Sequence, residues 1–86
     1  MKRVLYFTTK TCVPCQQMKP IAQQVCQEEG LPISFIDVEQ DGSMKTQYGI
    51  TSVPTIVVLD SNNNVSLRHT GAIPRPQFQR MIQSVK

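Results

Sequence analysis

Residues 3–30 read RVLYFTTKTCVPCQQMKPIAQQVCQEEG, and this stretch decides how the chain folds. It opens with a continuous apolar run, Val4 to Phe7, which is typical of a strand buried on both faces of a parallel or mixed sheet. Over residues 13–29 apolar side chains recur at intervals of three and four, so this segment is predicted to be a helix with one stripe facing the core, and Gly30 supplies its stop. A strand followed at once by an amphipathic helix indicates the first half of a right-handed βαβ unit.

The remaining sequence predicts two more helices and three more strands. We expect a strand over 33–38, a short helix between Asp41 and Gly49, strands over 55–59 and 65–69, and a last helix over 74–85. In the short helix the residues expected to face inward are Met44, Gln47 and Tyr48. Residues 60–64, DSNNN, have the composition of a hairpin turn, which makes the last two strands antiparallel.

The order of these elements is β-α-β-α-β-β-α. It predicts an α/β protein with a four-stranded mixed sheet, three helices and helices on both faces of the sheet. A chain of 86 residues can bury one hydrophobic core, so we expect a single domain over residues 1–86.

Composition excludes several classes of function. The net charge of +3 comes from basic residues that are scattered along the chain, so no nucleic-acid partner is expected. Lys10 interrupts the short apolar run near the amino terminus, and no long apolar stretch follows, so neither export nor membrane insertion is expected. Three cysteines, an odd number with two of them in a C-x-x-C, are not the pattern of a secreted disulfide framework and in a reducing compartment indicate redox or metal chemistry. We expect a cytoplasmic monomer.

The segment Cys12-Val13-Pro14-Cys15 carries the chemistry that the sequence predicts. A thiol reacts as its thiolate, and the amino end of a helix stabilises that charge through free backbone N–H groups and the helix dipole. Cys15 lies one turn further along the same face, within reach of a mixed disulfide at Cys12. Pro14 suits a first helical turn, where its missing N–H costs nothing. We therefore expect Cys12 to attack a disulfide and Cys15 to resolve the product.

Half of a zinc site would show the same cysteine spacing, so metal binding is the alternative. The eleven residues from Cys15 to Cys26 correspond to a helical rise of roughly 16 Å, which keeps Cys26 away from such a site. His69, the one histidine, still leaves the ligand set incomplete. We expect no bound metal or cofactor, a core position for Cys26 and no catalytic role for His69.

Four separated motifs, taken together, resemble the thioredoxin family over nearly the whole chain. They are the Cys12–Cys15 segment, Pro20 inside the following helix, Val53-Pro54-Thr55 before the third strand, and Gly71-Ala72 after the fourth. The resemblance implies a thioredoxin fold and a redox-active Cys12–Cys15 disulfide. It also implies a cis Pro54 beside the pair, with the Val53 backbone exposed for substrate.

The same resemblance implies the activity, a disulfide reductase acting on proteins. The residues expected to support the pair or contact substrate are Thr11, Val13, Pro14, Val53, Pro54, Gly71 and Ala72. Electrons would come from a thioredoxin-reductase-like flavoenzyme, and ribonucleotide reductase is among the recipients that the family suggests.

The sequence departs from the usual thioredoxin pattern at three positions. Thr11 replaces the usual tryptophan and Val13 the usual glycine. Tyr6 takes the place of a buried acid that helps to move the proton of the resolving thiol, so the Cys15 proton must leave by another route, through water or Lys10. Few residues precede Cys12, so we expect the first strand and helix of full-length thioredoxins to be missing, as in glutaredoxins. The alternatives to a reductase are a glutaredoxin-like activity, an oxidising or isomerising one, and a non-enzymatic interaction subunit.

Overall fold

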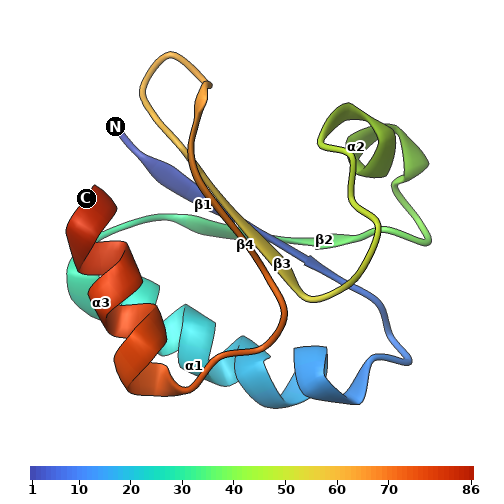
Figure 1. Cartoon of the computed structure of the whole chain (residues 1–86), viewed down its shortest axis with the longest axis horizontal. Helices are drawn as coiled ribbons and strands as arrows, with labels where there is room; N and C mark the ends of the chain where they lie inside the picture. Colours follow the sequence, from blue (N-terminus) through green and yellow to red (C-terminus); the bar gives the residue numbers. More distant parts are fainter.

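The computed structural model describes residues 1–86 and contains the seven elements in the predicted order (Figure 1). Their bounds are β1 (Arg3–Thr8), α1 (Val13–Glu29), β2 (Ile33–Asp37), α2 (Gly42–Gln47), β3 (Thr55–Leu59), β4 (Val65–Thr70) and α3 (Arg75–Val85). Most bounds fall within one residue of the expectation. Pro74 is the N-cap of α3 rather than its first helical residue, and Pro76 lies in the first turn, where proline is tolerated.

The four strands form one mixed sheet in the order β2-β1-β3-β4. β1 pairs in parallel with β2 and antiparallel with β3, and β4 closes the other edge antiparallel to β3. The predicted βαβ unit and hairpin are therefore confirmed. The chain leaves the carboxyl end of the central strand β1 and runs directly to the amino end of α1 (Figure 1).

Alternate side chains of β1 enter two separate cores, one on each face of the sheet. Val4 and Tyr6 pack with residues of α1 and α3, whereas Leu5 and Phe7 pack on the face that carries α2. Figure 1 shows α1 and α3 together on one side of the sheet and α2 on the other. This explains why the run from Val4 to Phe7 has no polar position, since each of its faces is covered.

The short helix α2 corrects one expectation. Met44 and Tyr48 are half-buried and pack on the second core, but Gln47 is exposed and no residue of α2 is fully buried. A helix of this length presents only one narrow stripe, which the pair at spacing i, i+4 already occupies. Asp41 caps the helix as expected, because its carboxylate accepts from the backbone N–H of Met44.

The long helix α1 has the stripe that the sequence predicts. Its buried residues are Cys15, Met18, Ala22, Val25 and Cys26. Gly30 ends the helix in the left-handed conformation, and Pro20 lies inside it, where it leaves one backbone carbonyl without its helical donor. The helix thus runs from the cysteine pair at its amino end to the packed interior between the sheet and α3.

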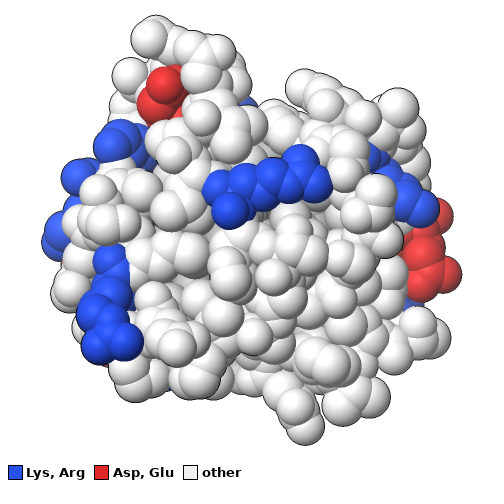
Figure 2. Space-filling view, viewed as in Figure 1, with Lys and Arg blue, Asp and Glu red and all other residues white.

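Charged side chains are spread over the surface. Figure 2 shows Lys and Arg at the left edge, across the centre and on the right of one face, with uncharged areas between them. No helix of the protein combines the length and the apolar composition needed to cross a membrane.

Candidate active site

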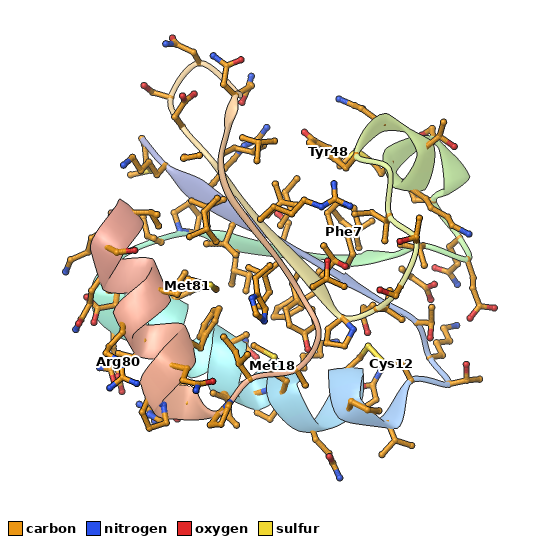
Figure 3. All side chains as sticks on the ribbon, in the orientation of Figure 1. Phe7, Cys12, Met18, Tyr48, Arg80 and Met81 are labelled. Carbon is orange, nitrogen blue, oxygen red and sulfur yellow. A yellow bond between two sulfur atoms is a disulfide. The ribbon has the colours of Figure 1, made fainter.

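Cys12 and Cys15 lie where the loop after β1 joins α1, and they form a disulfide with Cα atoms 5.2 Å apart. Cys12 is the N-cap residue of the helix, with extended backbone angles, and is partly exposed. Cys15 is fully buried. Figure 3 shows Cys12 at the amino end of α1, facing the sheet side of the helix. One sulfur is therefore open to a partner molecule and the other lies beneath it.

The amino end of α1 stabilises negative charge on Cys12. The Cys12 Sγ accepts a hydrogen bond from the backbone N–H of Cys15 at 3.2 Å, as a capping side chain does. In the reduced protein the same N–H and the helix dipole favour the thiolate over the thiol. The preceding loop is fixed because the Thr9 carbonyl accepts from the Cys12 N–H at 3.4 Å and from the Gln16 side chain at 3.0 Å.

A second segment, the turn before β3, lies against the cysteine pair. The Val53–Pro54 peptide bond is cis, and the Val53 carbonyl oxygen lies 3.8 Å from the Cys12 Sγ. In the disulfide that sulfur carries no proton, so the approach is a contact; a Cys12 thiol could donate to it. The Thr55 hydroxyl donates to the Ser52 carbonyl at 2.7 Å and holds the turn closed.

The segment after β4 joins the same surface. The Gly71 N–H donates to the Pro54 carbonyl at 2.8 Å, which links the two segments by their backbones. Gly71 has a φ of 102°, a backbone conformation that residues with a Cβ atom rarely adopt. Ala72 follows it and is exposed.

The predicted site residues thus divide into two groups. In the first group Val53 contacts Cys12 directly, Pro54 follows Val53 in the chain, and Gly71 is hydrogen-bonded to Pro54. The other group consists of exposed residues around the pair, which are Thr11, Val13, Pro14 and Ala72. Val13 is 63% exposed and leaves an apolar contact point next to Cys12 in the chain.

Two hollows flank this surface. One of about 310 Å³ is lined by Lys10, Thr11, Asp37, Glu39 and Gln40. Another of about 210 Å³ runs from Thr9 and Val53 towards α2 and is lined also by Val38, Glu39, Lys45, Ile50, Thr51 and Ser52.

Sequence reasoning missed two residues that support the site. The buried Tyr6 hydroxyl donates to the Cys15 carbonyl at 2.8 Å, and burial raises the pKa of this phenol to about 12. The Arg68 guanidinium donates to the carbonyls of Tyr48 and Gly49, where the chain leaves α2 towards Val53. A tyrosine in an otherwise apolar, doubly covered strand signals that its hydroxyl needs a partner. Arg68 gives no such signal, because it alternates with the half-buried Leu67 and His69 like any exposed strand residue.

The remaining candidates lie away from this surface. Cys26 is fully buried in the core, as predicted, and burial raises the pKa of its thiol to about 11. His69 pairs with Ile56 in the β3–β4 ladder and is partly exposed. No group of three or more His, Cys, Asp or Glu side chains lies close enough to hold a metal ion.

Comparison with known proteins gives a consistent family match. The family model described as Thioredoxin matches residues 1–84. Among curated proteins, the chain is 34% identical over 80 residues to thioredoxin Y, chloroplastic, of Oryza sativa subsp. japonica, covering 91% of this chain and 47% of that protein. It is 31% identical over 78 residues to thioredoxin of Bacillus subtilis, covering 88% of this chain and 74% of that protein. The chain therefore spans about half of the first relative and about three quarters of the second.

Solved structures show the same fold. The germline-specific thioredoxin Deadhead of Drosophila melanogaster superposes with a TM-score of 0.90 at 23% identity, covering 99% of this chain and 81% of that one. A mutant thioredoxin of Halobacterium salinarum gives a TM-score of 0.88 at 22% identity, covering 96% of this chain and 73% of that one.

Proposed function

The chain belongs to the thioredoxin family and is a thiol–disulfide oxidoreductase, and we propose that it reduces protein disulfides with Cys12 as attacking thiolate and Cys15 as resolving thiol. The observation that carries this division of labour is the difference in exposure. Cys12 is reachable from solvent and its sulfur is a helix N-cap, whereas Cys15 is fully buried. Only the first can meet a sulfur atom of another protein.

The exchange takes two steps. The Cys12 thiolate attacks one sulfur of a substrate disulfide, which forms a mixed disulfide and releases the other substrate sulfur as a thiolate. Cys15, once deprotonated, then attacks the Cys12 sulfur. The Cys12–Cys15 disulfide forms and the second substrate thiolate leaves. The substrate has gained two electrons, and two protons convert its sulfurs to thiols.

The backbone around the pair suits an extended substrate chain. Val53 and Gly71 bring main-chain groups close to Cys12, and Ala72 leaves space beside them. A substrate strand could pair with the Val53 backbone while its cysteine meets Cys12. Pro54 keeps this segment in place, and Thr11, Val13 and Pro14 would contact side chains that flank the substrate cysteine.

The proposal extends to partners and location. A thioredoxin-reductase-like flavoenzyme would return two electrons to the oxidised pair, and ribonucleotide reductase would be one recipient. The protein would act as a monomer in the cytoplasm, where reducing conditions suit a recycled dithiol. Its family membership supports these assignments.

An insulin-reduction assay tests the activity. With a thioredoxin reductase and NADPH as electron source, the wild-type protein should precipitate reduced insulin, and both Cys12→Ser and Cys15→Ser should lose turnover. A Cys26→Ala variant is the matched control, since it removes the third thiol and should keep the activity. If all four proteins behave alike, the chain is an interaction subunit rather than a reductase.

The reduction potential tests the direction. The dipeptide Val13-Pro14 between the cysteines differs from the family's usual pair, and such a difference could make the disulfide more oxidising, as in an oxidase or isomerase. A reductase should have a potential near that of thioredoxin, about −270 mV, whereas a value near −120 mV would identify a strong oxidant.

A further inference from the structure

The main chain of Cys15 is held at both ends by polar groups. Its N–H donates to the Cys12 Sγ at 3.2 Å, and its carbonyl accepts from the Tyr6 hydroxyl at 2.8 Å. Tyr6 belongs to the central strand of the sheet, and its side chain is fully buried. One residue of the redox pair is therefore tied both to its partner sulfur and to the most rigid part of the fold.

The hydrogen bond from the Tyr6 hydroxyl to the Cys15 carbonyl is costly to break. The hydroxyl donates to the Cys15 carbonyl, and no buried side-chain nitrogen or oxygen of the protein lacks a hydrogen-bond partner. A shift of the first turn of α1 would leave a buried donor unpaired, which costs more than the bond itself contributes. The ring cannot follow the turn freely, because it packs edge-on against Phe35 with centroids 5.4 Å apart.

We propose that Tyr6 is a positioning residue for the exchange reaction, and that its hydroxyl fixes Cys15 at the depth from which the Cys15 sulfur reaches Cys12. This inference rests on the proposed function, since it assigns the support for the resolving thiol. Holding two reacting thiols in register raises their effective concentration and so favours the disulfide over the open dithiol. The phenol does not act as a base, because burial raises its pKa to about 12.

The test compares Tyr6→Phe with Tyr48→Phe. Tyr6→Phe removes only the hydroxyl and keeps the ring that packs on Phe35. Tyr48 is the other tyrosine of the chain, and its ring packs on Phe7 on the opposite face of the sheet. Tyr48→Phe therefore makes the same chemical change away from the redox pair.

Each protein is equilibrated with mixtures of glutathione and glutathione disulfide. One glutathione disulfide is reduced to two thiols for each Cys12–Cys15 bond formed. We expect Tyr6→Phe to lower this equilibrium constant about fivefold, the effect of one ordinary hydrogen bond, which is about 20 mV for a two-electron couple. Tyr48→Phe should match the wild type.

Urea unfolding of the oxidised and reduced forms gives an independent check, because the change in the disulfide equilibrium constant must equal the difference between the stability losses of the two forms. The unfolding can be measured at low temperature if Tyr6→Phe is weakly folded. A positioning role requires a greater loss of stability in the oxidised form. Equal losses in the two forms, with an unchanged equilibrium constant, would show a purely structural role and overturn the proposal. Because glutathione is the only partner, this result does not depend on whether the protein reduces insulin.

Discussion

The backbone N–H of Cys15 donates a hydrogen bond to the Cys12 sulfur at 3.2 Å, so the residue that we propose as the resolving thiol also stabilises the sulfur that we propose as the attacking one. This contact arises because Cys12 is the N-cap of α1 and Cys15 is three residues further on. The spacing of the motif therefore sets two properties together. It places the second thiol within disulfide reach, and it directs a free helical N–H at the first.

Stability should depend on Cys26 at alkaline pH. Burial raises the pKa of this thiol to about 11, so between its ordinary range and that value the unfolded state binds fewer protons than the folded state. Unfolding free energy then falls as the pH rises. In a Cys12→Ser/Cys15→Ser background, where Cys26 is the one thiol left, urea unfolding at about pH 8 and about pH 10.5 should show this loss.

Adding Cys26→Ala to that background is the control. Most of the pH dependence between these two conditions should disappear, and the part that remains includes Tyr6, whose pKa burial raises from 10.0 to about 12, so that its destabilising effect begins near pH 10. An unchanged pH dependence would mean that the Cys26 thiol ionises as easily in the folded protein as in the unfolded chain.

Gly71→Ala should weaken both stability and substrate binding. At a φ of 102° an alanine is strained although no atom lies within 4 Å of its Cβ position, so the cost comes from the backbone alone. We expect a loss of about 1–2 kcal/mol in urea unfolding and a higher KM for insulin. Gly42→Ala is the matched control, because that Cβ also meets open space but the backbone φ is not positive. A similar loss in both variants would contradict the backbone explanation.

Arg68→Gln should loosen the segment that leads from α2 to Val53. The guanidinium bridges two successive carbonyls there, with 2.9 Å between its Nη2 and the Gly49 oxygen, and glutamine cannot replace both bonds. We expect amide hydrogen exchange of Ile50, whose N–H donates to the Lys45 carbonyl, to become about fivefold faster, equivalent to about 1 kcal/mol.

Arg80→Gln serves as the control for that measurement, since Arg80 is exposed on α3, away from α2 (Figure 3). Equal exchange rates at Ile50 in the two variants would show that Arg68 does not hold this segment.

The sequence predicted the elements well because the chain is short and its patterns are local. The run from Val4 to Phe7 has no polar position because both of its faces are covered, and the stripe of α1 has the spacing of one helix face. The inward position expected for Gln47 was wrong, because a helix as short as α2 has too few residues for hydrophobic periodicity to identify its buried face. The positions of Cys12, Cys15 and Pro54 followed from motifs that need no tertiary information.

The supporting contacts could not be predicted in this way. The bond from Tyr6 to Cys15 and those from Arg68 to the carbonyls of Tyr48 and Gly49 join residues far apart in the sequence, and each depends on strand register and helix placement. A sequence shows that a buried tyrosine needs an acceptor but not which carbonyl it finds.

Trapping of the mixed disulfide shows which of the two cysteines attacks the substrate. Reduced Cys15→Ser is mixed with a disulfide substrate such as insulin, intact-mass spectrometry detects the adduct, and peptide mapping under non-reducing conditions locates the bond. We expect a stable adduct on Cys12 in Cys15→Ser and no adduct in Cys12→Ser, whose remaining partner Cys15 is fully buried. An adduct that forms on Cys15, or equal adducts in the two variants, would contradict the assignment of Cys12 as the attacking sulfur.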